Sequence, residues 1–228
     1  MIIVTGGSSG LGREIAESLS RSGESVLTIS RRKLDVTSHL QCDLSDYYAV
    51  KKTYKEIQKR GEKVSALINC AGIASMNLAL TTPPEVTEKI IKTNLIGTIF
   101  CNQLFAPLLI KSGGGRIINF STIAVNLGLK GESIYVASKA GIEGFSRSLA
   151  RELASFKITV NCISPGPFPF PSVKKDYPDF CDRLKKKNPM AKLGKPDDLK
   201  GVFALLATKA SDFMTGQNIS VDGGWTIW

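Results

Sequence analysis

The feature that most constrains the fold is a regular alternation of short β-branched runs with longer segments of helical apolar periodicity. Runs of about four to eight β-branched residues favour strands, whereas apolar residues spaced every three or four positions favour amphipathic helices. The runs predicted as strands are Ile2–Thr5, Ser25–Ser30, Val64–Asn69, Gly115–Phe120, Lys157–Ile163 and Gln217–Val221. The segments predicted as helices are Leu11–Arg21, Asp46–Lys59, Pro84–Lys111, Ser133–Ser155 and Asp197–Ala207. Such alternation predicts an α/β fold with a parallel sheet and helices on both faces.

The strand runs are almost entirely apolar, as expected where both faces of a sheet are buried. No linker-like stretch or internal repeat interrupts the 228 residues, so we predict one domain, residues 1–228. Two segments break the alternation. The segment 31–42 is too short for a full crossover helix. The segment 164–190 begins with four prolines in seven residues and continues Lys-rich, and a long irregular insertion of this kind predicts a substrate lid, at about 167–195.

Composition excludes several classes of protein. The 43% hydrophobic and 22% charged content argues against disorder. No apolar run reaches the length a bilayer needs and no basic leader precedes Ile2, so we expect neither a membrane span nor a secretory signal. Five widely spaced cysteines fit no CxxC or zinc pattern, which favours reduced thiols in the cytoplasm. A single histidine, His39, which we expect in or near a short third strand, excludes a His-based triad and a multi-His metal site.

The formal net charge of +10 invites a nucleic-acid hypothesis, which depends on where the charge lies. Most of the excess is scattered, without a basic stripe or interleaved aromatic residues, so nucleic acid is a poor second interpretation. Lys185, Lys186 and Lys187 lie in the predicted lid. They either attract an anionic substrate or an acidic carrier protein, or form an ordinary solvated helix face.

A glycine-rich turn, TGGSSGLG at residues 5–12, follows the first strand and opens the first helix. Glycines let a backbone approach a pyrophosphate, which then sits at a helix N-terminus. A plain strand–helix turn is the alternative, but the position on the first strand favours a dinucleotide. Arg31 and Arg32 follow the second strand, where an acidic residue would bond the ribose of NAD. Two guanidiniums suit a 2′-phosphate and predict NADP(H) over NAD(H), the alternative being a solvated basic turn.

Tyr135 and Lys139 lie four residues apart in a predicted helix, on one face and one turn apart. A neighbouring ammonium lowers the pKa of a phenol, which predicts an acid/base tyrosine. The spacing alone also occurs by chance, with both side chains exposed.

Seven short motifs occur in the order typical of short-chain dehydrogenases/reductases, and over its whole length the chain resembles that family. They are TGGSSGLG, Asn69-Cys70-Ala71-Gly72, Asn94, Ser121-Thr122, Tyr135-Val136-Ala137-Ser138-Lys139, Pro165-Gly166 and Val221-Asp222-Gly223-Gly224. The resemblance implies a Rossmann-like, doubly wound parallel sheet of about seven strands. It also implies hydride transfer to or from a nicotinamide.

The resemblance assigns catalytic roles. Tyr135 would be the acid/base, Lys139 would bind the nicotinamide ribose and lower the pKa of Tyr135, and Asn94 would hold a relay water. Thr122 stands where the family has a serine that orients the substrate carbonyl, and successive side chains at a strand end point opposite ways. Thr122 is therefore preferred over Ser121, which could act through a bulge; a weak or inactive site is the third possibility.

Cofactor contacts carried over from the family involve the glycine turn, the end of the second strand and three later loops. The predicted residues are Gly6, Ser8, Ser9, Gly10, Leu11, Gly12, Arg31, Arg32, Asp43, Leu44, Asn69, Ala71, Gly72, Tyr135, Lys139, Pro165, Gly166 and Phe168. No metal is predicted. Phe170 stands where the family often has a threonine that bonds the nicotinamide amide.

These observations predict an NADP(H)-preferring oxidoreductase that interconverts a carbonyl and a secondary alcohol. Two substrate classes stay open: the chain resembles 3-oxoacyl-carrier-protein reductases and also sugar or sugar-acid dehydrogenases. A non-catalytic dinucleotide-sensing module is the competing hypothesis. The resemblance implies a homodimer or homotetramer, and Trp225 and Trp228 are expected against a neighbouring subunit, a substrate pocket or their own domain.

Overall fold

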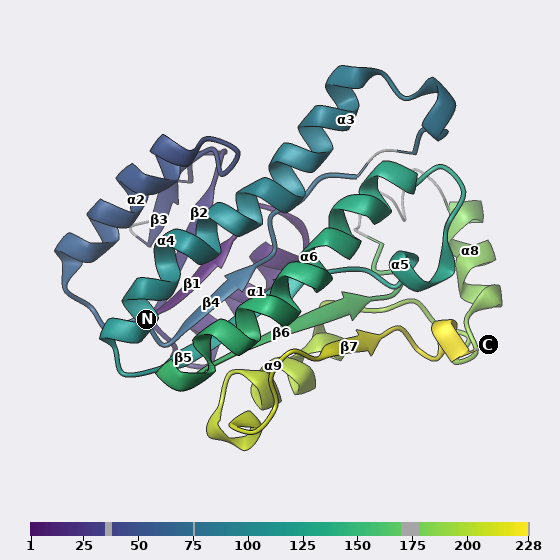
Figure 1. Cartoon of the computed structure of the whole chain (residues 1–228). Coiled ribbons are helices and arrows are strands. Elements are labelled where there is room, and N and C mark those ends of the chain that lie inside the picture. Colours follow the sequence, from purple (N-terminus) through teal and green to yellow (C-terminus); the bar gives the residue numbers. More distant parts are fainter. Residues whose placement is uncertain (35–37, 75, 170–177, 228) are drawn as a thin grey trace.

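The computed structural model places seven parallel strands in one sheet and describes residues 1–34, 38–74, 76–169 and 178–227 (Figure 1). The sheet order is β3-β2-β1-β4-β5-β6-β7. The strands are β1 (Ile2–Thr5), β2 (Val26–Ser30), β3 (His39–Gln41), β4 (Ala66–Asn69), β5 (Gly115–Phe120), β6 (Ile158–Pro165) and β7 (Asn218–Val221). This arrangement confirms the predicted Rossmann-like sheet, including the short strand at His39.

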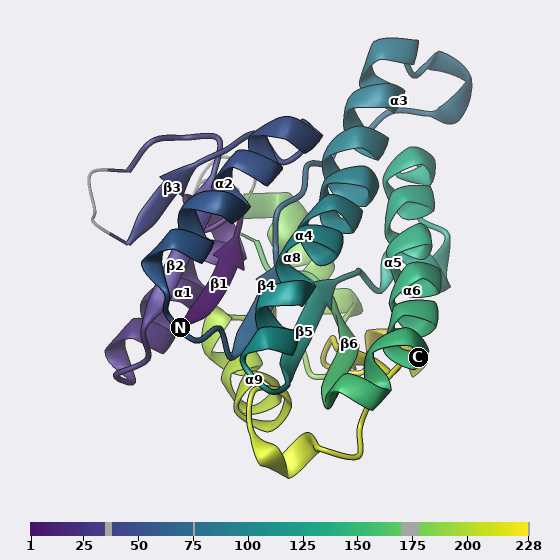
Figure 2. The same cartoon turned by 60° about the vertical axis from the view of Figure 1, so that its left-hand side comes forward.

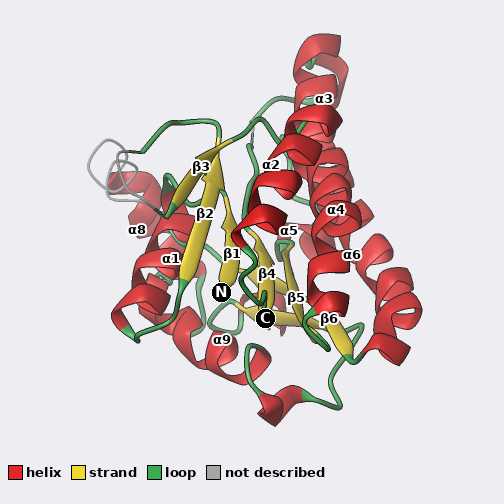
Figure 3. Ribbon diagram, turned by 90° about the vertical axis from the view of Figure 1, so that its left-hand side faces the viewer, coloured by secondary structure: helices red, strands yellow, loops and turns green. Residues whose placement is uncertain are grey.

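Helices cover both faces of the sheet, as Figures 2 and 3 show. The described α-helices are α1 (Gly10–Arg21), α2 (Tyr47–Arg60), α3 (Pro84–Ile91), α4 (Gly97–Lys111), α5 (Ala124–Leu127), α6 (Ser133–Leu153), α8 (Pro178–Lys187) and α9 (Lys200–Leu206). Short 3₁₀ turns occupy Ala79–Thr81, Ala154–Phe156, Pro196–Leu199, Lys209–Ser211 and Trp225–Ile227, and a π-helical turn occupies Lys92–Ile96.

Two apolar cores form because successive strand residues point to opposite faces. Ile3 contributes to the core beneath α2, α4 and α6, where Phe105 and Leu109 are fully buried. Its neighbours Ile2 and Val4 contribute to the core beneath α1 and α9. Burial on both faces explains why the strands lack a polar–apolar alternation.

The helical segment Pro84–Lys111 is long and apolar enough, by length and composition, to cross a membrane, contrary to our expectation from the sequence. Half of its most apolar window is buried inside the protein, and Phe105, Ala106 and Leu109 pack in the core against the sheet. A core helix of a Rossmann-like fold carries this composition because the sheet and its neighbouring helices cover it.

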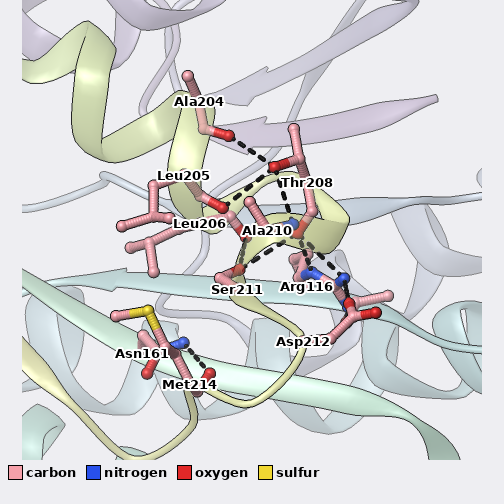
Figure 4. Close-up of polar contacts among 11 residues, drawn as sticks. Arg116, Asn161, Ala204, Leu205, Leu206, Thr208, Ala210, Ser211, Asp212 and Met214 are labelled. Atoms are coloured by element: carbon pink, nitrogen blue, oxygen red, sulfur yellow. Dashed lines mark hydrogen bonds and ion pairs between the residues drawn. The ribbon is translucent and has the colours of Figure 1, made fainter.

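A polar cluster joins the connection between α9 and β7 to the central strands (Figure 4). The guanidinium of Arg116, at the start of β5, donates to the carbonyl oxygen of Thr208 at 3.1 Å and pairs with Asp212. On β6, Asn161 donates to the carbonyl oxygen of Met214 at 2.8 Å. These bonds fasten the connection that precedes β7 to β5 and β6.

Two segments between β6 and β7 differ in the structure from their predictions. The lid contains the ten-residue helix α8, so it is not irregular throughout. Lys185–Lys187 lie exposed in the last turn of α8, where the helix dipole favours cations. The predicted helix Asp197–Ala207 is a 3₁₀ turn followed by α9. Phe170 and Trp228 lie outside the described residues, and Trp225 is half-buried.

Phe105→Ala tests the core beneath α4. Phe105 is fully buried, so its truncation should lower the free energy of unfolding by about 3–5 kcal/mol through lost burial and the cavity left behind. The matched control is Phe213→Ala, because Phe213 is fully exposed and its loss should change stability by less than about 0.5 kcal/mol. Urea unfolding measures both, and equal losses would contradict this packing.

Candidate functional site

The loops that follow β1, β4 and β5 meet at one edge of the sheet because these strands are neighbours and parallel. Gly6 opens the loop after β1 with a positive φ of 73°, and its N–H donates to the carbonyl oxygen of Ile29 on β2. A side chain at Gly6 would lie 2.8 Å from the backbone of Ala71, and one at Gly12 would lie 2.6 Å from the carbonyl oxygen of Gly6. Only glycine permits this packing, which brings Ala71 and Gly72 beside the turn.

Helix α1 begins at Gly10 with its first-turn N–H groups unsatisfied by a side-chain cap. Its N-cap, Ser9, has extended backbone and makes no capping bond, and the first turn carries no acidic residue. An anion is therefore favoured at this helix terminus, and the cradle of glycine backbone fits a pyrophosphate. Ser8, Gly10, Leu11 and Gly12 lie in the same turn, as the sequence predicted.

Tyr135 and Lys139 lie one turn apart near the start of α6, with the Lys139 ammonium 5.9 Å from the centre of the Tyr135 ring. The Lys139 ammonium donates to the carbonyl oxygen of Phe120, the last residue of β5, at 2.8 Å. Lys139 is buried, and this burial lowers its pKa to about 8. A hydrogen-bonded ammonium that releases a proton near neutral pH can take part in proton transfer.

The lowered pKa expected for Tyr135 is not found, because the net shift of its pKa is upward. Burial of the phenol, together with the charge of Glu132 three residues earlier, raises the pKa of Tyr135 to about 12. The side chain of the neighbouring Thr122 shifts the pKa in the opposite direction, more weakly. Desolvation dominates because the charged phenolate loses more solvation than one neutral hydroxyl returns. Tyr135 is therefore a protonated phenol at neutral pH.

Ser121 and Thr122 follow β5 and have different partners. The Ser121 hydroxyl donates to the Glu143 carboxylate at 2.6 Å, and both side chains are buried. Thr122 lies against Tyr135 and also accepts from the N–H of Ala124 at 3.2 Å. The alternation of side chains at the strand end thus separates the two hydroxyls, with Thr122 facing Tyr135.

Asn94 is fully buried in the π-helical turn between α3 and α4. Its side-chain amide donates to the carbonyl oxygen of Ile73 and to the Ser138 hydroxyl, and its carbonyl accepts from the N–H of Ile73. A side chain added at Gly72 would lie 3.4 Å from both Asn94 and the Lys139 ammonium, so these groups converge. Both amide donors of Asn94 are engaged, so a water would be held through its carbonyl oxygens.

Asn69, at the end of β4, is buried with its side chain turned into the protein. It donates to Asn119 at 2.8 Å and accepts from the Thr5 hydroxyl at 3.4 Å. A contact of Asn69 with a cofactor would therefore come from its backbone. Leu44 is buried, its backbone facing Gly97, and Asp43 is exposed and accepts from Ser45.

Arg31 and Arg32 are exposed directly after β2, beside the glycine turn. Within the described part of the chain neither guanidinium forms an ion pair with a carboxylate. Two uncompensated cations at this position fit a phosphate dianion.

Pro165 and Gly166 end β6, where the Gly166 N–H donates to the carbonyl oxygen of Val221 on β7 at 3.0 Å. Next to them is a cavity of about 240 Å³ under the lid. Its lining includes Gly166, Phe168, Asn188, Met190 and Asp222. The Phe168 ring packs closely on Gly194, so Phe168 forms a wall of this cavity.

Sequence reasoning missed Glu132 and Glu143. Glu132 raises the pKa of Tyr135, and its own pKa is raised by burial. Glu143 lies one helical turn beyond Lys139, and this spacing of four could have placed it on the same face of α6.

The fold and this constellation define an NAD(P)-dependent α/β oxidoreductase. Residues 6–226 match the family model described as "Enoyl-(Acyl carrier protein) reductase". The chain belongs to the short-chain dehydrogenase/reductase family.

Its similarities extend over nearly the full length of several relatives. It is 34% identical to the 3-oxoacyl-[acyl-carrier-protein] reductase FabG of Staphylococcus aureus, covering 97% of this chain and 96% of the relative. It is 31% identical to a 2-dehydro-3-deoxy-L-rhamnonate dehydrogenase (NAD(+)) of a Sphingomonas species, covering 99% and 95%. The ligand-free structure of Thermoplasma acidophilum aldohexose dehydrogenase superposes with a TM-score of 0.94 at 29% identity, covering 100% and 94%.

Lys139→Met tests the burial of the ammonium. Lys139 has a pKa of about 8 when folded against an ordinary value of 10.5, so between these values the unfolded chain binds more protons and stability rises with pH. The destabilisation caused by burying the cation is complete below pH 8 and disappears towards pH 10.5. Relative to Lys139→Met, the wild type should therefore gain about 2–3 kcal/mol across this window.

Denaturant unfolding of both proteins at several pH values measures this gain. The raised pKa of Cys42 acts oppositely and equally in both proteins, so the comparison cancels it. Cys70 and Cys162 interact with the Lys139 charge, so the measured gain includes their response to the loss of that charge. The matched control is Lys55→Met, whose exposed side chain should give a pH-independent difference. A pH-independent difference for Lys139→Met as well would refute the burial effect.

Proposed function

We propose that this chain is an NADP(H)-preferring reductase that converts a carbonyl to a secondary alcohol, with Tyr135 as the proton donor. The observation that carries the proposal is the convergence of Tyr135, Thr122 and the buried Lys139 at the end of β5. A non-catalytic sensor would not need a buried ammonium beside a buried phenol, because burying both costs stability.

The proposed roles follow from the geometry. The Thr122 hydroxyl lies against Tyr135, so both can donate to one substrate oxygen. Because the pKa of Tyr135 is about 12, the phenol is protonated at neutral pH and can donate its proton as negative charge develops on that oxygen. Lys139, with a pKa of about 8, then supplies a proton towards Tyr135. The Asn94 side chain hydrogen-bonds the Ser138 hydroxyl and the backbone of Ile73, and so holds both next to Lys139.

The cofactor would lie along the carboxyl ends of the central strands. The glycine backbone and the α1 N-terminus would hold its pyrophosphate, Arg31 and Arg32 its 2′-phosphate, and Gly72 and Gly166 would line the nicotinamide end. When bound, the nicotinamide supplies the hydride. NADPH is preferred in this proposal, although one relative is named for NAD(+).

For the substrate we propose a 3-oxoacyl group on an acidic carrier protein. The relative FabG acts on such groups by its name, and three exposed lysines end α8 next to the cavity under the lid. A positive rim beside a substrate entrance attracts an acidic partner. The second candidate is an aldose or sugar acid, which the 0.94 TM-score to aldohexose dehydrogenase favours. A panel of acetoacetyl-carrier and aldose substrates separates the two.

We further propose a single-domain subunit of a homodimer or homotetramer in the cytoplasm, with residues 167–195 as the substrate lid. Cys42, Cys70, Cys101 and Cys162 form no disulfide with one another, which fits a reducing compartment.

Tyr135→Phe and Thr122→Val test the catalytic assignment. Removal of the phenolic hydroxyl should abolish NADPH-dependent reduction, and Thr122→Val should lower kcat by about 10²-fold because one donor to the developing oxyanion is lost. Ser121→Ala is the control, since the Ser121 hydroxyl is committed to Glu143 and its loss should cost less than about 10-fold. Steady-state kinetics measures all three variants. Unchanged turnover in Tyr135→Phe would overturn the role of Tyr135 as proton donor. A wild type that binds NADPH but turns over no substrate would favour the dinucleotide-sensing hypothesis.

Arg31→Asp tests the cofactor preference. The carboxylate would repel the 2′-phosphate of NADPH and accept from the 2′-hydroxyl of NADH, so the ratio of kcat/KM values should shift towards NADH by at least about 100-fold. The comparison is made on one substrate with both cofactors. A wild type that prefers NADH would overturn our interpretation of the arginine pair.

A further inference from the structure

The turn that carries Arg31 and Arg32 is fastened to the edge strand β3 by two side chains. β3 pairs with β2 in parallel register, with Thr28 opposite His39 and Ser30 opposite Gln41. Alternate strand residues share a face, so His39 and Gln41 lie on one face and Leu40 on the other. Leu40 packs against the core beneath α2, which leaves His39 and Gln41 facing the other side.

Both side chains bond backbone carbonyls of the arginine pair. The Gln41 side-chain amide donates to the carbonyl oxygen of Arg31 at 2.9 Å. His39 Nε2 lies 2.9 Å from the carbonyl oxygen of Arg32, and a carbonyl can only accept, so this nitrogen carries the proton. His39 Nδ1 lies 2.9 Å from the Thr28 hydroxyl, which fixes the other edge of the ring. The Ser30 hydroxyl also donates to the Arg32 carbonyl at 2.9 Å.

These bonds hold the backbone and leave the guanidiniums free. Arg31 and Arg32 are exposed, and in the described residues no carboxylate competes for them. The segment 31–42 is too short for a crossover helix, which would otherwise support such a turn. A loop already ordered before binding loses less conformational entropy when the ligand arrives.

We infer that His39 and Gln41 are positioning residues that order the Arg31–Arg32 turn and thereby determine selectivity for a 2′-phosphorylated dinucleotide. The inference rests on the proposed preference for NADP(H). Only the 2′-phosphate engages the two guanidiniums, so loosening the turn weakens NADPH binding and leaves NADH binding nearly unchanged. A purely structural role for β3 would instead weaken both dinucleotides alike.

Titration of the intact protein with NADPH and with NADH, followed by nicotinamide fluorescence, tests this inference. His39→Leu and Gln41→Met remove the donors without adding charge, and each should weaken NADPH binding by about 5-fold, the double variant by about 20-fold. NADH affinity should stay within about 2-fold. His39→Gln keeps a side-chain donor and should restore most of the NADPH affinity. Gln58→Met, a matched change at an exposed position on α2, should alter neither affinity.

The outcomes separate this inference from the proposed function. A wild type that binds NADH better than NADPH overturns the cofactor preference and this inference with it. A wild type that prefers NADPH, with an unchanged preference ratio in the double variant, overturns the inference alone. An equal loss of both affinities, accompanied by a lower melting temperature, assigns His39 and Gln41 a structural role and also overturns it. A fall in the NADPH preference with unchanged NADH affinity supports it.

Discussion

The hydrogen bonds of the buried Asn119 side chain are the interaction on which the edge of the sheet that carries the candidate site depends. Its carbonyl accepts from Asn69 at 2.8 Å and from Asn102 at 3.3 Å, and its amide donates to the Ser146 hydroxyl at 2.8 Å. One side chain thereby ties the end of β5 to β4, α4 and α6, and Asn69 extends the network to Thr5 on β1. Buried polar groups are costly unless paired, so this network tolerates few alternative arrangements. Tyr135 and the glycine turn are both carried by elements that it connects.

The same edge shows how strand geometry assigns chemistry to adjacent residues. Ser121 and Thr122 both carry hydroxyls, but successive side chains at the strand end point opposite ways. The Ser121 hydroxyl therefore faces the buried Glu143 carboxylate, and Thr122 faces Tyr135. The bond from Ser121 to Glu143 fastens the strand end to α6, the helix that bears Tyr135 and Lys139. Glu143 therefore stabilises the register in which Thr122 faces the phenol.

Most of the fold followed from periodicity, whereas the electrostatics of the site did not. All six predicted strands correspond to observed strands within a few residues. Apolar β-branched runs such as Ile2–Thr5 are typical of strands whose two faces are both buried. Helix α8 was missed because its Lys-rich sequence is hydrophilic throughout the last turn and follows a proline-rich stretch. The sign of the Tyr135 pKa shift was missed because spacing indicates which charges are near but not how deeply a phenol is buried. The role of Ser121 needed Glu143, a residue 22 positions away.

Burial shifts the pKa values of Tyr135 and Lys139 in opposite directions, and this contrast determines where protons are held in the site. Desolvation disfavours both the phenolate and the ammonium, so the pKa of Tyr135 rises to about 12 while that of Lys139 falls to about 8. The Lys139 ammonium therefore releases its proton more readily than the Tyr135 phenol does. A phenol with this raised pKa stays protonated at neutral pH, so it can donate a hydrogen bond to a carbonyl oxygen. In the proposed reduction, the phenol would donate its proton as negative charge develops on that oxygen, and the Lys139 ammonium would supply a proton towards Tyr135.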